Sequence, residues 1–152
     1  MKPIRNSARA IIIENGKVLL TKNSDASGYF YLFPGGGQEP GEELREAVIR
    51  ECIEEIGKEV NVGELMFVRE YIGKNHEFAE WDYDFHQIEF YFSCTLESTD
   101  GLMVNGNNPD SNQVAVKWID IDALENIRLY PKTLGEKIKE NLLSPVYLGD
   151  TN

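Results

Sequence analysis

The sequence predicts an α/β protein whose β-sheet is mixed and carries helices on its faces. Residues 8–14 are rich in β-branched side chains, and Asn15-Gly16 joins them to a returning strand at 17–21, so the chain opens with an antiparallel hairpin. A helical pattern follows at 42–56, and a long strand with period-2 stretches follows at 87–96. Strands and helices therefore alternate around an antiparallel start, which is typical of a mixed sheet.

Local signals place the elements on either side of the central helix. Residues 29–33 predict a short aromatic strand, which Pro34 and three glycines should end as an open loop. The helix at 42–56 should close at Gly57. Further along, we expect a strand at 60–72 interrupted at Gly63, a strand at 114–119, a helical turn at 120–124 with Asp120 as N-cap, and a last helix at 132–143.

Length and charge limit the function classes. The 152 residues are expected to form one domain, 1–152. With 26 acidic against 15 basic residues, the net charge is −11, which argues against tight binding to nucleic-acid polymers or anionic membranes. The two cysteines, Cys52 and Cys94, are too few for a disulfide framework, so we expect them to be buried in a cytoplasmic protein with no membrane segment.

The central helix carries a row of carboxylates. At 100° per residue, Glu51, Glu54 and Glu55 share an arc of about 100°. The same geometry predicts a buried stripe on the other side of the helix, formed by Ile49, Cys52, Ile53 and Ile56. Three carboxylates at this spacing repel one another, and a hard divalent cation with oxygen ligands would turn the repulsion into binding.

The glycine loop before this helix adds a second feature. Gly35, Gly36 and Gly37 allow the backbone to approach a ligand closely, and a helix N-terminus beside them favours phosphate. Loop and carboxylates together indicate a site for Mg²⁺ and phosphate. On geometry alone, an acidic helix face that simply meets solvent is the favoured interpretation.

The order of the residues favours the first interpretation, because residues 36–58 resemble the Nudix box of the Nudix hydrolase family. The box is Gly, five residues, Glu, seven residues, Arg-Glu, an apolar residue, any residue, Glu-Glu, any residue, Gly and an apolar residue. The chain meets it with Gly36, Glu42, Arg50, Glu51, Cys52, Glu54, Glu55 and Gly57, and departs from it only at Lys58. The hairpin and the Trp118 strand also resemble the family's layout, from about residue 8 to residue 142.

The resemblance implies an α/β/α sandwich fold and hydrolysis of a phosphoanhydride in a nucleoside diphosphate linked to another group, such as a nucleoside triphosphate or a nucleotide sugar. It implies Mg²⁺, with Mn²⁺ as a substitute, as the cofactor. Glu51, Glu54, Glu55 and the Gly35 carbonyl would be metal ligands. Arg50 would orient a box glutamate, and Gly36, Gly37 and Glu42 would support the loop.

Two roles stay open at this stage. The carboxylate that takes the proton from water is either Glu51 or an acid outside the box, where Asp110 is the only candidate in the loop 105–113, unless Asp110 is simply a turn residue. Tyr31 and Trp81 are candidate substrate contacts, with Trp81 in an acidic and aromatic segment at 73–85. The favoured alternative is ordinary packing for Tyr31, and packing on the sheet or a dimer contact for the aromatic residues of 73–85.

Two other functions compete with hydrolysis. One is a non-catalytic sensor that binds a nucleotide on the same fold, and the other is an isomerase of that fold. The complete set of box glutamates argues against both. A homodimer is expected from the family alone.

Overall fold

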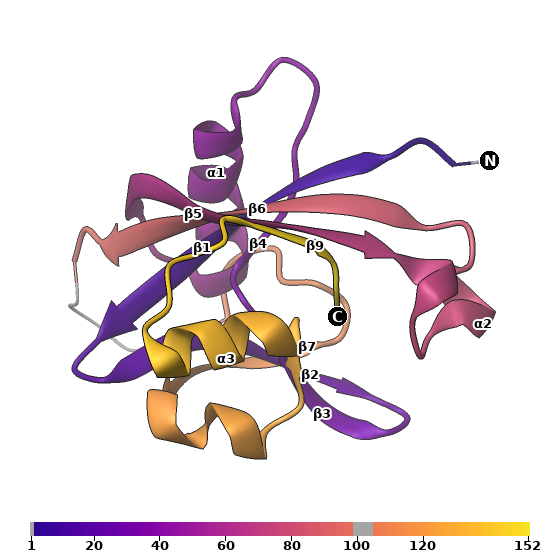
Figure 1. Ribbon diagram of the computed structural model, residues 1–152. Helices are drawn as coiled ribbons and strands as arrows, with labels where there is room; N and C mark the ends of the chain where they lie inside the picture. Colours follow the sequence, from indigo (N-terminus) through magenta and orange to yellow (C-terminus); the bar gives the residue numbers. More distant parts are fainter. Residues whose placement is uncertain (1, 99–104) are drawn as a thin grey trace.

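The computed structural model describes residues 2–98 and 105–152 and contains one curled, mixed sheet (Figure 1). Its strands are β1 (Arg5–Glu14), β2 (Lys17–Asp25), β3 (Gly28–Leu32), β4 (Gly35–Gly37), β5 (Val60–Ile72), β6 (His86–Leu96), β7 (Gln113–Asp120), β8 (Leu129–Tyr130) and β9 (Tyr147–Asp150). The helices are α1 (Leu44–Ile56), α2 (Ala79–Asp82) and α3 (Lys132–Glu140), with 3₁₀ turns η1 (Gly73–Asn75) and η2 (Ile121–Asn126).

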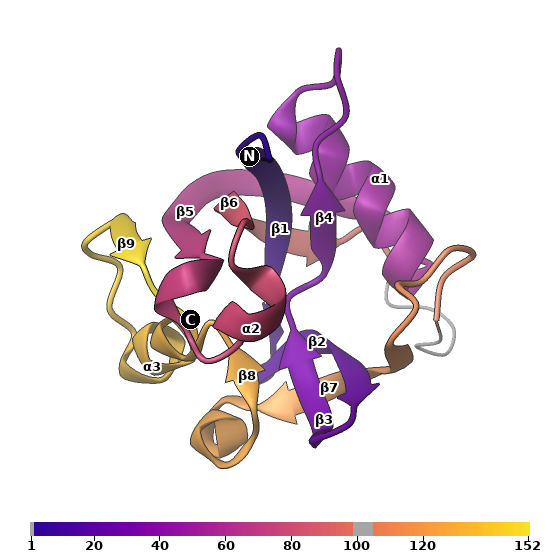
Figure 2. The same ribbon diagram turned by 90° about the vertical axis from the view of Figure 1, so that its right-hand side faces the viewer.

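Strand β1 lies at the centre of the sheet. The strand order is β8-β3-β2-β1-β6-β5-β9, with β4 paired to β1 and β7 paired to β2. Pairings β1–β6, β5–β9 and β3–β8 are parallel and the others are antiparallel, so the expected mixed sheet is confirmed. Helix α1 lies on one side of the sheet and α3 on the other, in two roughly perpendicular views (Figures 1 and 2).

Several expected elements are confirmed and others shift. The hairpin turns at Asn15-Gly16, and β5 changes register between Val62 and Leu65, at the expected interruption. Helix α1 begins at Leu44, not at residue 42, because Glu43 and Glu46 form a capping box. Helix α3 ends at residue 140 because Asn141 adopts the left-handed conformation. The expected open glycine loop is wrong: Gly35–Gly37 is strand β4, paired with residues 7–9.

The buried face of α1 also differs from the expectation. Ile49 and Ile53 are 38% and 37% exposed, while the buried residues of the helix are Ala47, Val48, Cys52, Glu55 and Ile56. The buried arc is therefore rotated toward the glutamates, and it packs on Ala8, Ala10 and Ile12 of β1. As a result the carboxylates do not stand opposite the core; they lie at its edge, and one of them lies inside it.

The other face of the sheet holds a buried ionic cluster around Glu89 of β6. Its carboxylate accepts hydrogen bonds from Arg9 Nε at 2.7 Å, Arg69 Nε at 2.5 Å, Gln87 Nε2 at 2.8 Å and the Tyr91 hydroxyl at 2.6 Å. Glu89 is 2% exposed. Burial alone would raise the pKa of Glu89, but the two arginines hold it at about 2.

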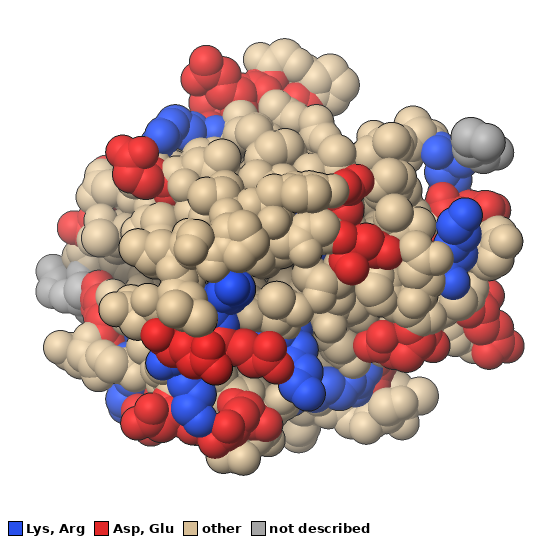
Figure 3. Space-filling view, in the orientation of Figure 1, with Lys and Arg blue, Asp and Glu red and all other residues tan. Residues whose placement is uncertain are grey.

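Acidic and basic side chains are intermixed on the face of the molecule shown in Figure 3. Red side chains lie over α3 and around α2 with blue ones among them, so this face carries no continuous acidic sheet (Figure 3). Cys52 and Cys94 are buried free thiols, as expected. Within residues 2–98 and 105–152, no helix is long and apolar enough to span a bilayer.

We predict that Glu89→Gln costs about 3–5 kcal/mol of unfolding free energy, because it leaves two buried guanidinium groups without their counter-charge. Urea denaturation measures the loss. Glu64→Gln, an exposed change of the same kind in β5, is the control and should change the free energy by less than about 0.5 kcal/mol.

The interaction of Glu89 with the two arginines also makes the free energy of unfolding depend on pH. The folded pKa of Glu89 is about 2, below its ordinary value of 4.5, so its stabilising effect is complete above pH 4.5 and is lost as the pH falls toward 2. Wild type should lose stability over this interval more steeply than Glu89→Gln. Parallel stability curves for the two proteins would contradict the assignment.

Candidate active site

Arg50 of α1 is the centre of an ion-pair cluster on the edge of the sheet. Its Nη1 lies 3.0 Å from Glu51 Oε1 and 3.4 Å from Glu54 Oε2. Its Nη2 donates to Glu42 Oε1 at 2.7 Å and to the Gly37 carbonyl at 2.8 Å. A single guanidinium thus joins three carboxylates to the glycine strand. These hydrogen bonds are charge-assisted and therefore stronger than bonds between neutral groups.

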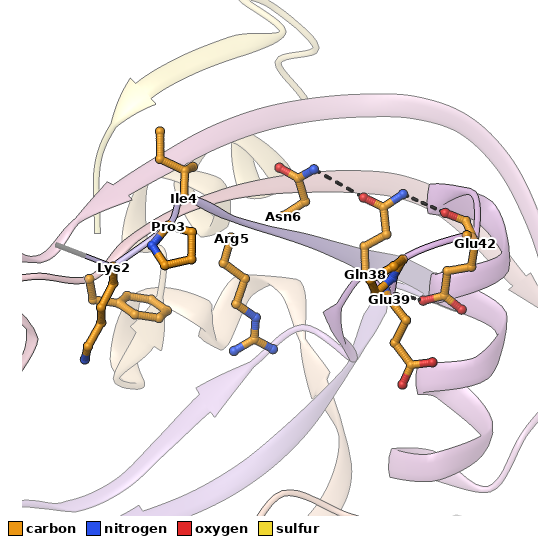
Figure 4. A pocket seen from close by; sticks show the side chains of 11 residues that line it. Lys2, Pro3, Ile4, Arg5, Asn6, Gln38, Glu39 and Glu42 are labelled. Atoms are coloured by element: carbon orange, nitrogen blue, oxygen red, sulfur yellow. Dashed lines mark hydrogen bonds between the residues drawn. The ribbon is translucent and has the colours of Figure 1, made fainter.

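Glu42 also organises the segment between β4 and α1. Its carboxylate accepts from Glu39 N at 2.9 Å, and its main-chain oxygen accepts from Gln38 Nε2 at 2.8 Å. The Gln38 amide in turn accepts from Asn6 of β1, so a chain of bonds crosses from β1 to the start of α1 (Figure 4). The segment is therefore held at both ends.

The glycine strand touches the glutamates directly. A Cβ on Gly36 would lie 2.7 Å from the Glu51 carboxyl carbon, so only glycine leaves room for this carboxylate. Gly35 N donates to Glu55 Oε1 at 2.7 Å, and the Gly35 carbonyl lies 3.4 Å from Arg9 Nη1. The proposed carbonyl ligand and two proposed carboxylate ligands thus lie along one short strand.

Two of the box glutamates lie where burial disfavours their charged form. Burial raises the pKa of Glu55 to about 8, although Arg9 opposes this shift, and the charges of Asp110 and Glu51 add to it. Burial also raises the pKa of Glu51, although Arg50 opposes the rise. At Glu42, the bond from Arg50 lowers the pKa instead.

The carboxylate and carbonyl oxygens of this site are of the kind that binds a divalent cation, but the side chains do not converge on a single point. Within the described residues, no three His, Cys, Asp or Glu side chains converge closely enough to hold a metal ion. Arg50 explains this, because its Nη1 already bridges Glu51 and Glu54. Two carboxylates that share one cationic nitrogen, beside a buried third whose charged form is disfavoured, are suited to share a hard metal ion through their oxygens.

The loop 105–113 packs against the end of α1. Gly106 N and Gln113 Nε2 donate to the Glu55 carbonyl at 2.9 and 2.7 Å, and Asn108 N donates to the Glu54 carbonyl at 2.9 Å. Asp110 lies in this loop, near enough for its charge to raise the pKa of both Glu51 and Glu55. The Asp110 main-chain oxygen accepts from Gln113 N at 2.9 Å, so Asp110 begins a turn, as the alternative interpretation held, and its role as a base stays a prediction.

A pocket of about 270 Å³, which we call the aromatic–arginine pocket, opens next to the glycine strand. Its walls include Arg9, Arg69, Phe30, Phe78, Tyr130 and Asn152. Arg9 joins this pocket to the strand, because its Nη1 also lies 3.4 Å from the Gly35 carbonyl. Arg9 and Arg128, which also line this pocket, were not predicted as pocket residues, because Arg9 is brought there by sheet pairing and Arg128 by the C-terminal third of the chain.

The two aromatic candidates lie elsewhere. Tyr31 packs against the hydrophobic cluster that includes Phe33 and Leu129. Its neighbours Phe30 and Leu32 line the aromatic–arginine pocket. Trp81 is 78% exposed on α2 and lines none of the cavities beside β4. Within the segment 73–85, Phe78 is the aromatic residue that reaches the pocket, where it makes an edge contact with Tyr130.

Comparison with known families agrees with this geometry. The model of the NUDIX domain matches residues 4–140. The chain belongs to the NUDIX domain family. The match covers β1 through α3, so the box glutamates, the glycine strand and the aromatic–arginine pocket all lie largely within the family domain. This Nudix hydrolase therefore presents its box on α1 and β4, as the resemblance implied.

Individual relatives are Nudix hydrolases of several kinds. A CTP pyrophosphohydrolase from Escherichia coli is 41% identical over 83 residues, which are 51% of this chain and 61% of that protein. An RNA pyrophosphohydrolase from Campylobacter jejuni is 28% identical over 158 residues, covering 90% and 91%. A NUDIX hydrolase structure from Nitrosomonas europaea has a TM-score of 0.72 at 21% identity, covering 95% and 93%, which supports the α/β/α fold.

We predict that Gly36→Ala lowers activity about 10- to 100-fold while the protein still folds. The new Cβ displaces the Glu51 carboxylate, and a displacement near 1 Å is enough for such a loss. Steady-state kinetics over a range of Mg²⁺ concentrations measure it, and half-maximal activity should need more Mg²⁺.

A double-mutant cycle checks that the effect runs through Glu51. Adding Gly36→Ala to Glu51→Gln should cost little further activity, since the displaced group is already impaired. Full additivity of the two losses would show that Gly36 acts in another way.

Proposed function

We propose that this protein hydrolyses a phosphoanhydride bond in a nucleoside diphosphate linked to another group, with Mg²⁺ as cofactor and Mn²⁺ as a substitute. The observation that carries the proposal is the cluster in which Arg50 joins Glu42, Glu51 and Glu54 to the glycine strand. The pyrophosphohydrolases among its relatives support the same reaction type.

In this proposal Glu51, Glu54, Glu55 and the Gly35 carbonyl hold the metal. When bound, Mg²⁺ neutralises the charge of the pyrophosphate and makes water a better nucleophile. Arg50 keeps two of these carboxylates oriented, and the buried Glu55 fixes Gly35 through its N–H. These residues therefore set the position of the ligand oxygens before substrate arrives.

The chemical step is an attack by water on one phosphorus, with cleavage of the bond from that phosphorus to the bridging oxygen. A carboxylate takes the proton of the water, and the bridging oxygen leaves on the other phosphate. Glu51 is our candidate for the base because it is half-buried next to Gly36, with Asp110 as the alternative outside the box. We assign the nucleoside to the aromatic–arginine pocket. Arg9 lines this pocket and also binds the Phe33 carbonyl, two residues before the glycine strand, so the pocket lies beside the proposed metal site.

Two expectations accompany this function. The protein is expected to act in the cytoplasm on small nucleotides, and a homodimer is expected from the family. The RNA pyrophosphohydrolase relative makes a 5′-triphosphorylated RNA a necessary comparison, although the net charge of −11 favours small substrates.

We predict turnover of at least one compound in a panel of nucleoside triphosphates, nucleotide sugars, ADP-ribose, dinucleoside polyphosphates and a 5′-triphosphorylated RNA. Glu54→Gln should reduce the rate about 100-fold, because loss of a metal ligand costs at least as much as loss of an outer partner. Phosphate and nucleotide products are measured with Mg²⁺ and with Mn²⁺.

The control is Glu64→Gln, which removes an equal charge from an exposed position on β5 and should keep full activity. Binding of a panel compound without turnover would favour the sensor. Full activity of Glu54→Gln would show that the metal assignment is wrong even if the function is right.

A further inference from the structure

Three side chains of β1 form a row beside the glycine strand. Arg5, Ser7 and Arg9 are two residues apart, so they point to the same face of the sheet. Strand β4 runs antiparallel along β1, with Ser7 opposite Gly37 and Arg9 opposite Gly35 (Figure 2). The row therefore follows the same strand that contacts the box glutamates.

Both arginines fold over glycines of β4. A Cβ on Gly35 would lie 2.8 Å from Arg9 Cγ, and a Cβ on Gly37 would lie 2.5 Å from Arg5 Nη2. Neither glycine has a side chain to screen the guanidinium above it. The two positive groups thus lie against bare backbone at the two ends of β4.

The two arginines differ in what they bind. Arg9 is 13% exposed, its Nε donates to Glu89, and its Nη1 donates to the Phe33 and Gly35 carbonyls. Arg5 is exposed and has no hydrogen-bond or ion-pair partner among the residues that the structure describes. Between them, the Ser7 hydroxyl is buried and also without a partner in that part of the chain. The row keeps hydrogen-bonding capacity that the protein does not use.

A cavity marks each end of the row. The aromatic–arginine pocket lies at Arg9, and an open cavity of about 740 Å³ lies at Arg5. Lys2, Arg5, Gln38, Glu39 and Glu42 are among the residues that line the open cavity. In Figure 4, Arg5 extends from β1 to the same side as Lys2 and Glu39, and no bond is drawn to it. Arg9 is four residue steps along the strand from Arg5, about 13 Å of chain.

We propose that Arg5, assisted by Lys2, binds the terminal phosphate of a nucleoside triphosphate that runs from the aromatic–arginine pocket across β4. The inference rests on the proposed function and names its substrate class. In this placement the nucleoside lies at the Arg9 end of the row, and the far end of the triphosphate, which carries charge, lies at Arg5. A nucleotide sugar would place a neutral ring beside Arg5 and leave the guanidinium unused.

The surrounding charge supports this assignment. The substrate must approach an edge that carries Glu39, Glu42 and Glu51, all of which repel a polyphosphate. Arg50 cannot offset this, because its donors are already taken by carboxylates and by Gly37. Arg5 and Lys2 are the cations lining the open cavity whose charge is not neutralised by an ion pair in the described structure. A planar guanidinium suits a phosphate oxygen pair.

The test compares Arg5→Ala with wild type on a nucleoside triphosphate and on a nucleotide sugar with the same base. We expect KM for the triphosphate to rise about 10- to 100-fold, the loss of one or more charge-assisted bonds, with less than about a twofold change for the sugar. Arg5→Lys should recover part of the loss. Lys17→Ala, which removes an exposed positive charge at the other end of the β1–β2 hairpin, is the matched control.

Gly37→Ala is a second variant that leaves Arg5 in place. Its Cβ would occupy the position of the guanidinium, so the same selective loss on the triphosphate is expected. Equal losses on both substrates would show that Arg5 supports the fold of β4 and does not read a phosphate. An unchanged KM for the triphosphate in Arg5→Ala would also overturn the proposal.

Binding separates this proposal from the proposed function. A nucleoside triphosphate with methylene groups in place of the bridging oxygens, titrated with Mg²⁺ by calorimetry, should bind wild type about 10- to 100-fold more tightly than Arg5→Ala even if hydrolysis is never observed. Equal affinity for the two proteins, or no binding to wild type, would refute the role of Arg5. If the binding difference is present and hydrolysis is absent, only the hydrolase function fails.

Discussion

The bonds of the Arg50 guanidinium hold the acidic side of α1 and the glycine strand together as one unit. Glu42, Glu51 and Glu54 would repel one another on a surface of net charge −11, and each is in contact with Arg50. The bond to the Gly37 carbonyl adds the strand to the same group. The relative position of helix and strand, and with it the orientation of the Glu51 and Glu54 carboxylates, depends on this one side chain.

A second ionic group supports the strand from the opposite face. Glu89 neutralises Arg9 and Arg69, and Arg9 contacts the Gly35 carbonyl. Glu55 holds the N–H of Gly35 from the helix side. Gly35 is thus fixed by a carboxylate on one face and a guanidinium on the other, and the aromatic–arginine pocket shares that guanidinium. Pocket, strand and acidic helix are therefore connected through Arg9 and Glu55.

Local patterns predicted the hairpin, the strand interruption at Gly63 and the residues of the Nudix box, because turn chemistry and a fixed spacing need only neighbouring residues. The same patterns failed for the packing of α1. Ile49 and Ile53 were expected in the core but are exposed, since the helix turns its box glutamates toward β4. Helical periodicity predicts the buried side of a helix from the apolar residues alone. In α1, the bonds to Arg50 and Gly35 decide which side faces the sheet.

Long-range pairing explains what the sequence could not show. Arg9 and Glu89 are 80 residues apart, and only the parallel β1–β6 pairing brings them together. Three glycines in a row indicated a loop because they carry no strand propensity, yet β1 pairs with them and makes them strand β4. Residues 147–150, with no clear pattern of their own, add the edge strand β9.

The most direct test of the central claim is the melting temperature of metal-free protein with and without millimolar Mg²⁺. If the carboxylates that Arg50 orients form the metal site, Mg²⁺ binds the folded state and raises the melting temperature of wild type, with a clearly smaller rise for Glu54→Gln. Glu64→Gln should respond as wild type does. A wild-type melting temperature that Mg²⁺ leaves unchanged, or an equal rise in wild type and Glu54→Gln, would contradict the account.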